Sequence, residues 1–563
     1  MAAKVALLSY LLIFMSKLKK NIFILSALSA VLLSIPFLMP HCGWVALFGF
    51  VPLFAAQTLA ENHKVRFFFL YYYFSFVLWN AITTFWIWFA TPAGAIAAIL
   101  LNSLQMAVIF WLFIKMKKVT KGYLPYLFFI VTWLAWEHGY ANCDISWPWL
   151  TLGNSFATSI KSIQWYEVTG TLGGSLWILL CNTLLYRIIT LKLSKQRIRV
   201  SLLAYCLVLA VPFAASLILW SVRGEELSGS KSKEILVIQP NIDPYNEKFG
   251  GLTQQEQNDI FFKLYSENFS KEVSLVLAPE TFVSPSSSST LMIENKPFAN
   301  ESFCRFKEEL ANMNCKYGST ASMIFGAVTD YIYYGQGAVA PSETAREIPG
   351  LEWYDRYNTA VFLSSNGEHD FYHKSKLVIL VESTPFKGLM KFLKRFEIDL
   401  GGMLGSFGKS PDAEVFILPD SVKVGTAICY ESVYGDYYRR YVEKGAGFMT
   451  IITNDGWWRD TPGYRQHLSF ASLRAIETRR DIARCANTGI SAFINSRGEI
   501  ISQTAWNEAA ALKGSVSLND RKTIFVVWGD LIGRIGCFVF FLLFLMLISR
   551  LLSRKRIVYE NLT

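Results

Sequence analysis

The placement of the long apolar segments limits the fold of this chain more than any other feature. They fill roughly the first 222 residues and return in a final block, Thr523 to Leu552, whereas the stretch between them has the composition of a soluble protein. A mean hydropathy of +0.31, with 52% hydrophobic residues, is too high for an ordinary soluble protein. The chain is therefore predicted to be a membrane protein that carries one large polar domain.

Windows of about 20 apolar residues predict eight membrane spans, seven before the polar block and one after it. The predicted spans are 21–38, 42–60, 67–90, 93–114, 122–140, 168–190, 200–222 and 524–549. We therefore divide the chain into a transmembrane bundle (1–228), a polar domain (229–520) and a last transmembrane helix with a cytoplasmic tail (521–563). No small-residue cleavage site follows the first apolar residues, so no removed signal peptide is predicted.

Lysine and arginine gather at every second boundary between the predicted spans. The clusters are Lys17/Lys19/Lys20, Lys64/Arg66, Lys115/Lys117/Lys118/Lys121, Lys192/Lys195/Arg197/Arg199 and Arg550/Arg554/Lys555/Arg556. Basic loops favour the cytoplasmic side, so all five clusters can lie there and the polar block then lies outside the cytoplasm. The net charge of +11 thus reflects membrane topology, and no nucleic acid partner is predicted.

The polar block alternates apolar strand patterns with helical patterns. The predicted strands are 233–242, 273–281, 322–328, 359–365, 422–429, 448–454 and 491–496. Strands that alternate with helical crossovers, with some antiparallel pairs among them, are typical of a layered α/β domain.

The nine cysteines are scattered, without CxxC pairs or Cys/His clusters at zinc spacing, so neither a metal site nor a cofactor is predicted. Only Cys304 and Cys315 are close enough in sequence to suggest a disulfide. Cys429 ends the run VGTAIC (424–429). It is either a buried core thiol, which is the common role of free cysteine, or a nucleophile at the end of a strand.

Two other reactive side chains also follow predicted strands. Glu280 ends LVLAPE, and Lys374 lies in DFYHKSKL. Layered α/β sheets carry their chemistry at the carboxyl ends of strands. There the carboxylate can take the proton of Cys429, the sulfur can attack a carbonyl, and the ammonium can stabilise the oxyanion. Taken singly, Glu280 is also typical of a surface loop and Lys374 of a solvated lysine.

In this order and at these separations, LAPE, YHKSKL and ICYES resemble the Glu-Lys-Cys triad of the nitrilase superfamily. A domain of this kind outside the membrane, with seven spans before it and one after, resembles the apolipoprotein N-acyltransferase family. Further matches are WPWLTLGN (147–154), IQPNI (238–242), RYNTAVFL (356–363) and the long segment that begins TNDGWWRD and ends at residue 493. The resemblance implies an αββα sandwich for the polar domain.

The resemblance also implies roles for individual residues. Cys429 would be the nucleophile, Glu280 the general base and Lys374 the cation on the oxyanion side, supported by Glu382, Tyr430 and Glu431. The turn before Glu382 departs from the family pattern, because LVILVE (377–382) stands where LVPFGE is expected. A charged lysine among carboxylates is expected to favour the thiolate form of Cys429.

The activity implied is transfer of an acyl chain from a membrane phospholipid, through a thioester, to the N-terminal diacylglyceryl-cysteine of an apolipoprotein. This is the last step of lipoprotein maturation, at the periplasmic side of the bacterial cytoplasmic (inner) membrane. Two alternative functions are also compatible with this sequence. The chain could be a membrane-anchored amidase that acts on a small amide, or a transporter or scaffold whose outer domain binds ligands without chemistry.

Two segments are candidates for contact with lipid. PFKGLMKFLKRFEI (385–398) places Phe386, Leu389 and Leu393 on one side at helical spacing, with basic residues opposite. It is predicted either as a mobile arm that admits acyl chains or as a helix packed on its own domain. Trp457 and Trp458, in NDGWWRD, either line a lipid-facing mouth or fill a core or an interface.

Overall fold

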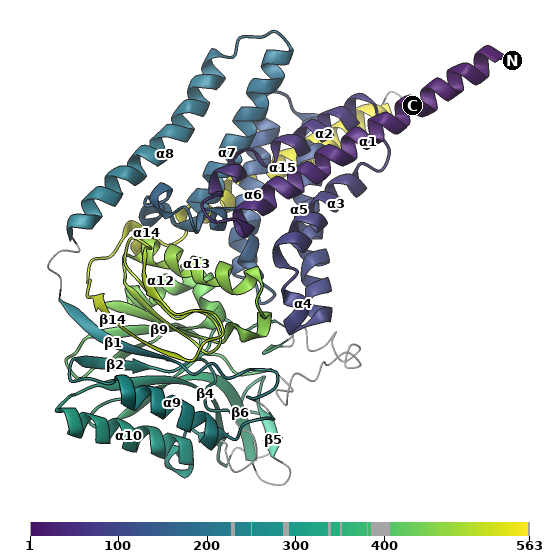
Figure 1. Ribbon diagram of the computed structural model, residues 1–563. Helices are drawn as coiled ribbons and strands as arrows, with labels where there is room; N and C mark the ends of the chain where they lie inside the picture. The colour runs from purple at the N-terminus through teal and green to yellow at the C-terminus, as the bar shows by residue number, and fades with distance from the viewer. Residues whose placement is uncertain are drawn as a thin grey trace.

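The computed structural model describes residues 2–226, 231–248, 250–284, 292–335, 339–348, 352–379, 381–383 and 406–560. A helical bundle forms one end of the molecule and a layered α/β domain the other (Figure 1). The bundle helices are α1 (Ala2–Leu38), α2 (Val51–Asn62), α3 (Phe69–Thr84), α4 (Ile87–Ala90), α5 (Pro92–Val119), α6 (Leu124–Ala141), α7 (Tyr166–Leu193), α8 (Arg199–Glu226) and α15 (Leu531–Glu560).

Six helical segments among the described residues are long and apolar enough to cross a membrane. They are Lys17–Leu38, Gly43–Asn62, Pro92–Val119, Tyr166–Leu193, Arg199–Val222 and Leu531–Ser553. Each overlaps one of the predicted spans. The predicted span 122–140 is also helical, as the 18-residue α6, whose polar end carries Glu137 and His138.

Two predicted spans need correction. The span 67–90 is not one helix, because the chain turns at Trp86 between α3 and α4. The Trp86 indole is buried there, with Nε1 3.1 Å from the Thr83 carbonyl oxygen. The last span begins at Leu531 and not at 524, because Gly529, at φ +64°, ends the short helix α14 (Ile524–Trp528). Only glycine adopts this backbone region at low cost.

The α/β domain contains two sheets that pack face to face. Its strands are β1 (Ser232–Gln239), β2 (Val273–Leu277), β3 (Met292–Ile293), β4 (Ser322–Tyr333), β5 (Arg346–Ile348), β6 (Glu352–Leu363), β7 (His369–His373), β8 (Val415–Ile417), β9 (Lys423–Ile428), β10 (Phe448–Thr453), β11 (Ile482–Ala486), β12 (Ala492–Ile494), β13 (Ile500–Gln503) and β14 (Ala510–Ser517).

The first sheet has eight strands, in the order β14-β1-β2-β4-β6-β5 with β3 beside β4 and β7 beside β6, and the second has six, in the order β13-β12-β11-β10-β9-β8. Helices α9 (Gln254–Asn268) and α10 (Glu301–Tyr317) cover the outer face of the first sheet. Helices α12 (Gly435–Glu443) and α13 (Pro462–Thr478) cover the second (Figure 1). The predicted αββα sandwich is confirmed.

Strand β1 shows how sequence alternation builds these layers. Ile235 and Val237 point into the core between the two sheets, whereas Leu236 and Ile238 point toward α9 and α10. Successive side chains of a strand face opposite sides, so a strand with both faces covered needs a continuous apolar run. The run ILVI at 235–238 meets this need.

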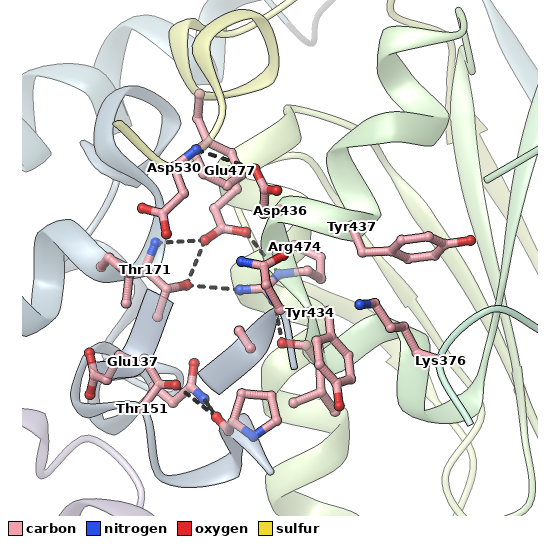
Figure 2. Close-up of a pocket in the computed structure, with 18 of the residues that line it drawn as sticks. Glu137, Thr151, Thr171, Lys376, Tyr434, Asp436, Tyr437, Arg474, Glu477 and Asp530 are labelled. Atoms are coloured by element: carbon pink, nitrogen blue, oxygen red, sulfur yellow. Dashed lines mark hydrogen bonds and ion pairs between the residues drawn. The ribbon is translucent and has the colours of Figure 1, made fainter. Parts of the chain in front are cut away.

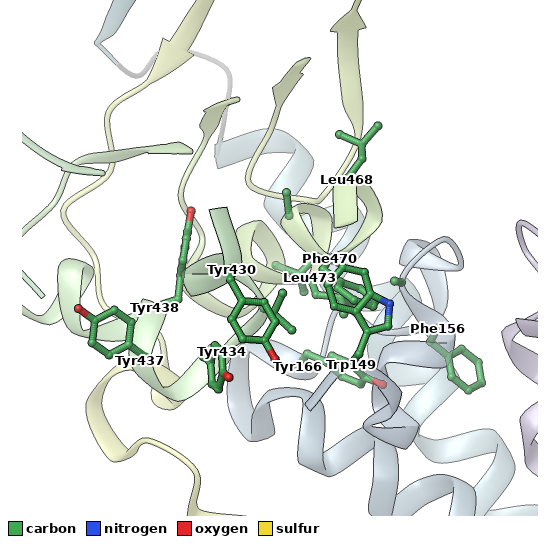
Figure 3. Close-up of a cluster of buried hydrophobic side chains, with 14 of the residues drawn as sticks. Trp149, Phe156, Tyr166, Tyr430, Tyr434, Tyr437, Tyr438, Leu468, Phe470 and Leu473 are labelled. Atoms are coloured by element: carbon green, nitrogen blue, oxygen red, sulfur yellow. The ribbon is translucent and has the colours of Figure 1, made fainter. Parts of the chain in front are cut away.

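The core between the sheets continues without interruption into the helical bundle. One cluster of buried side chains includes Phe50 and Trp133 of the bundle, Trp149 from the loop after α6, Tyr430 beside Cys429, and Ile451 of β10. Figure 3 shows the middle of this cluster, where Tyr430 and Tyr434 lie beside Trp149 and Phe470. The bundle and the α/β domain therefore share apolar packing.

The disulfide suggested by the spacing of Cys304 and Cys315 does not form. Both residues are free and lie on the single helix α10. Eleven helical positions correspond to about 16 Å at 1.5 Å per residue. A disulfide requires Cα atoms within about 7 Å.

Candidate active site

Cys429 follows β9 directly and begins the short 3-10 helix η8 (Cys429–Val433). Its φ is +50°, a backbone region that non-glycine residues rarely adopt. Such strain persists only where the surrounding structure enforces it, and it is frequent at functional sites. The side chain is buried, with 8% exposed. The expected placement of Cys429 at a strand end is confirmed, and burial alone does not make it a core residue.

Glu280 lies in the turn that follows β2, packed closely over β4. The turn is held by Gly326 of β4, whose N–H donates to the Pro279 carbonyl at 3.1 Å. A Cβ on Gly326 would lie 2.6 Å from Glu280 Cα, which no real contact allows. Glycine at this position thus permits the close approach that turns the Glu280 carboxylate inward, where only 6% of the residue is exposed.

Four polar side chains form what we call the carboxylate–lysine cluster: Glu280, Asn358, Lys374 and Glu382. Lys374 Nζ lies 2.8 Å from Glu280 Oε1 and 3.0 Å from Glu382 Oε1. The Asn358 amide donates to the same two oxygens, at 2.8 and 2.7 Å. All four residues are buried, so water does not screen these interactions. The Cys429 thiol lies close enough to this cluster for the charges of Glu280 and Lys374 to act on its pKa.

The turn before Glu382 forms although it lacks the expected proline and glycine. The Glu382 N–H donates to the Val378 carbonyl at 2.8 Å, and the Val378 N–H donates to Glu382 Oε2 at 2.8 Å. This reciprocal pair aims Oε1 at Lys374. Glu382 thus holds the position that the sequence predicted, with a turn of different composition.

The charges of the cluster fix its protonation. Burial alone would raise the pKa of Glu280, but Lys374 and then Asn358 outweigh it and hold the pKa below its usual 4.5. Burial opposes the charge of Lys374, yet Glu280 and Glu382 raise its pKa well above 10.5. Burial and next the charge of Glu280 raise the pKa of the Cys429 thiol well above 9.0. Lys374 acts in the expected direction, since its charge lowers the pKa of Cys429, but burial and the charge of Glu280 outweigh it.

Glu431 braces the segments that carry Lys374 and Cys429. Its carboxylate accepts hydrogen bonds from the N–H of Ser375 at 2.6 Å and from the N–H of Ile428 at 2.8 Å. Ser375 follows Lys374, and Ile428 precedes Cys429. The hydroxyls of Tyr372 and Tyr441 donate at 2.8 and 2.9 Å to the same carboxylate. A buried carboxylate with four donors is rigidly held, so Glu431 fixes the spacing between amine and thiol.

A second buried array supports the backbone of Cys429, and the sequence interpretation assigned none of its members. His467 Nε2 lies 3.2 Å from the Cys429 carbonyl oxygen, and His467 Nδ1 lies 3.0 Å from Asp455 Oδ1. Asp455 also pairs with Arg484 at 2.5 Å. These residues belong to the segment 453–493, which was matched to the family as a whole. Only folding reveals which of its many polar residues reach the nucleophile.

Gln466, the neighbour of His467 on α13, binds the bundle. Its side-chain amide donates to the carbonyls of Phe37 and Thr83, at 3.0 and 3.2 Å, and its oxygen accepts from the Trp86 and Trp149 indoles. One helical turn of α13 therefore contacts both the bundle and the nucleophile's backbone.

Aromatic rings pack where the segment after Cys429 meets the bundle. The Tyr430 ring stacks on Trp147, with centroids 5.8 Å apart, and its hydroxyl donates to the Ser146 carbonyl at 3.1 Å. Trp458 is half-buried, and its ring lies 4.7 Å from that of Trp86. Trp457 packs edge-on against Tyr245 at 5.5 Å. Phe386, Leu389 and Leu393 lie outside the described residues.

Among known proteins, the Carbon-nitrogen hydrolase family matches residues 252–524, and the Apolipoprotein N-acyltransferase N-terminal domain family matches residues 29–184. The Apolipoprotein N-acyltransferase of Chlorobaculum tepidum is 30% identical over 92% of this chain and 95% of that protein. The protein of the same name from Geobacter metallireducens is 25% identical over 90% of this chain and 92% of its own length.

Solved structures similar to the chain include Nit3 of Saccharomyces cerevisiae, a member of branch 10 of the nitrilase superfamily. It is 16% identical and covers 54% of this chain and 97% of its own, with a TM-score of 0.34. An amidase from Nesterenkonia sp. is 15% identical over 53% of this chain and 93% of its own, with a TM-score of 0.34. Since the Chlorobaculum protein is matched along nearly its whole length, bundle and α/β domain together, this chain belongs to the apolipoprotein N-acyltransferase family.

Proposed function

We propose that the protein transfers an acyl chain from a membrane phospholipid to the α-amino group of the N-terminal S-diacylglyceryl-cysteine of apolipoproteins. Family membership supports lipoprotein N-acylation. The observation that carries the mechanism is the buried, ionised carboxylate of Glu280, which Lys374 holds at 2.8 Å and whose charge acts on the protonated thiol of Cys429.

In the first half-reaction, Glu280 takes the proton of Cys429 while the sulfur attacks an ester carbonyl of the phospholipid. Lys374 and a backbone N–H near Tyr430 stabilise the tetrahedral oxyanion. The C–O bond of the ester then breaks, and Glu280 returns the proton to the departing oxygen of the lysophospholipid. An acyl thioester remains on Cys429, and Glu280 is again ionised.

In the second half-reaction, the α-amino group of the apolipoprotein attacks the thioester carbonyl while Glu280 accepts its proton. The C–S bond breaks, the proton passes to the sulfur, and an amide carries the new acyl chain. The pKa shifts support this cycle, because the proton begins and ends on sulfur while Glu280 stays ready to receive it. The thioester preserves the activation of the ester, so the transfer needs neither ATP nor a metal.

The site is proposed to lie on the periplasmic side of the bacterial cytoplasmic (inner) membrane, with the five basic clusters in the cytoplasm. Both substrates are then anchored in one bilayer, and the bundle reduces the entropic cost of bringing them together. Trp457 and Trp458 are proposed to line a lipid-facing mouth that keeps water from the thioester. Phe386, Leu389 and Leu393 are proposed to form the apolar face of an arm that admits acyl chains.

Incubation of the purified protein with acyl-labelled phospholipid tests the proposal. A labelled protein adduct that hydroxylamine releases is expected for the wild type and for the control Cys304→Ala, whose cysteine lies in α10 away from the cluster. Cys429→Ala should form no adduct. Addition of a diacylglyceryl-peptide should discharge the adduct and yield a labelled amide. Absence of any adduct from the wild type would favour the membrane-anchored amidase.

A further inference from the structure

The polar pocket between the bundle and the α/β domain contains side chains that hold these two parts together (Figure 2). Thr171 of α7 donates its N–H to the Glu477 carboxylate of α13 at 2.7 Å, and the Thr171 hydroxyl oxygen accepts from Arg474 at 2.8 Å. Asp530 contacts His138 at 2.6 Å. The charges of this pocket therefore act as structural links.

Lys248 is a buried charge of a different kind, because its contacts lie on the turn that carries Glu280. Its Nζ lies 2.8 Å from Thr281 Oγ1 and 3.5 Å from the carbonyl oxygen of Glu280. Only 5% of Lys248 is exposed. Burial of an ammonium costs free energy that an apolar side chain of similar length would not incur. The amine at this place thus suggests a role for its contact with the turn.

The turn after β2 is strained at the residue that Lys248 contacts. Thr281 has a φ of +47°, and a β-branched side chain rarely adopts this backbone region. Such a conformation persists only where the surrounding structure enforces it. Gly326 fixes the start of the turn through the Pro279 carbonyl, and the Ser284 hydroxyl donates to the Thr281 carbonyl at 2.6 Å. Lys248 contacts the peptide between these two supports, which joins Glu280 to Thr281.

The backbone of Lys248 is itself held in place. Its N–H donates to the Asp243 carbonyl at 2.9 Å, and its carbonyl accepts from the side-chain amide of Gln257 at 3.1 Å. Gln257 belongs to α9, which packs on the first sheet. The amine therefore reaches the turn from a fixed point, so it can determine where the Glu280 backbone lies.

The charges of Lys248 and Glu280 act on each other. Burial lowers the pKa of Lys248 to about 8, and the charge of Glu280 acts in the opposite direction. Above this pKa the neutral amine still has N–H groups that can donate to the same oxygens. Glu280 remains ionised there, because its own pKa lies below 4.5. The contact with the turn therefore does not depend on the charge of Lys248.

We propose that Lys248 is a positioning residue for the general base: it holds the peptide between Glu280 and Thr281, so that the Glu280 carboxylate stays in place beside Lys374. The inference rests on the proposed function and adds to it a residue that acts through Glu280. Lys374 differs in its role, because it contacts the carboxylate itself.

The test measures the rate of acyl-enzyme formation against the mole fraction of labelled phospholipid in mixed detergent micelles. Lys248→Met keeps the length of the side chain and removes the amine. The plateau rate should fall by about 10–10², as expected for a displaced catalytic group, while the half-saturating mole fraction changes less than about twofold. The control Lys423→Met, an exposed lysine at the start of β9, should behave as the wild type.

Thr281 provides a second pair of variants that removes the same contact from the other side. Thr281→Val keeps the β-branched shape and loses the hydroxyl, so its plateau rate should fall in the same way. Thr281→Ser retains the hydroxyl and should keep a rate near that of the wild type. This pair decides the question even if Lys248→Met does not fold.

A double variant separates positioning from a general effect on the fold. If Lys248 acts through Glu280, Lys248→Met should slow the Glu280→Gln protein by less than about twofold, because the base is already absent. A lysine that only stabilises the fold would slow both backgrounds by the same factor.

Three results would overturn the inference. They are an equal loss of rate in both backgrounds, a plateau rate that neither Lys248→Met nor Thr281→Val changes, and a shift of the half-saturating mole fraction alone, which would indicate contact with the lipid. Failure of the proposed function is distinct from all three, because then the wild type itself forms no adduct.

Discussion

Two of the buried clusters of charge among the described residues differ in balance. At the junction with the bundle, Arg479 pairs with Glu167 at 2.5 Å and donates to the Gln164 side chain at 2.6 Å and to the Ser496 carbonyl at 2.9 Å. We call this the junction clamp. In this clamp one cation pairs with one anion, and the guanidinium also donates to neutral acceptors. The carboxylate–lysine cluster instead assigns two carboxylates, Glu280 and Glu382, to one ammonium.

This difference separates a structural ion pair from a reactive one. In the junction clamp the charges balance and the guanidinium is hydrogen-bonded on several sides, so the pair is not suited to accept a proton or bind a substrate. The carboxylate–lysine cluster keeps a net negative charge beside a neutral thiol, so one of its oxygens can accept a proton once the sulfur attacks. Burial of charge is common to both clusters, and the excess carboxylate beside Cys429 is what distinguishes the site.

The largest effect is expected from removal of the proton acceptor. Glu280→Gln keeps the shape of the side chain but cannot take the thiol proton, so the rate of acyl-enzyme formation should fall by about 10²–10⁴. Rapid-quench measurement with labelled phospholipid gives this rate. Glu272→Gln, an exposed glutamate just before β2, is the matched control and should retain the wild-type rate. A Glu280→Gln rate within tenfold of the wild type would contradict the assignment of the base.

Loss of Lys374, the cation that both carboxylates share, should have the next largest effect on the acylation rate. Lys374→Met leaves Glu280 and Glu382 facing each other without a counter-charge and removes the group proposed to stabilise the oxyanion, so acylation should slow by about 10²–10³. The same quench assay measures it, with Lys423→Met as the control. If Lys374→Met acylates normally, the oxyanion is stabilised elsewhere.

Breaking the junction clamp should act on stability and not on chemistry. Arg479→Met leaves Glu167 buried without its cation, and the free energy of unfolding should fall by about 3–5 kcal/mol. Thermal unfolding in detergent, followed by tryptophan fluorescence, monitors the loss. The double variant Arg479→Met/Glu167→Met should recover much of it, because no unpaired charge remains. Acylation per folded molecule should stay within about twofold of the wild type, and a drop comparable to that of Glu280→Gln would erase the distinction between the clusters.

The smallest effect is expected from pH. The pKa of Glu280 lies below its ordinary value and that of Lys374 above it, so neither group changes charge near neutrality. The stability due to Glu280 is present above its unfolded pKa and is lost as pH falls through its folded pKa. The stability due to Lys374 is lost only as pH rises through its own raised pKa. Acyl-enzyme formation should therefore be level between about pH 6 and 9, and a sigmoidal rise centred near 7 would show that the base or the thiol titrates there.

The sequence identified candidate site residues where a reactive side chain comes directly after a strand pattern. Glu280, Lys374 and Cys429 each come just after an apolar strand pattern. The structure brings the first two within 2.8 Å, and the charge of Glu280 acts on the Cys429 thiol. Asn358 was not recognised because an asparagine inside a strand gives no pattern of its own. His467 was hidden for a similar reason, since its contact with Cys429 spans 38 positions of the chain.

Apolar periodicity was wrong about the predicted span 67–90, which is two helices. It merged α3 with α4, because Trp86 between them is apolar like the residues of a span, although its indole donates a hydrogen bond to Gln466. Lys374 favours the thiolate of Cys429 as expected, but the cost of burying a charge and the charge of Glu280, which oppose it, depend on three-dimensional surroundings. Spacing along the chain does not report either of them.

The adjacency of Gln466 and His467 has a mechanical consequence. One side chain donates to the ends of two bundle helices, α1 and α3, and the next contacts the carbonyl of the residue that carries the sulfur. Any sliding between the bundle and the sheets must strain this single turn of α13. The sulfur therefore stays at a fixed distance from the bundle, and a substrate has to move to it.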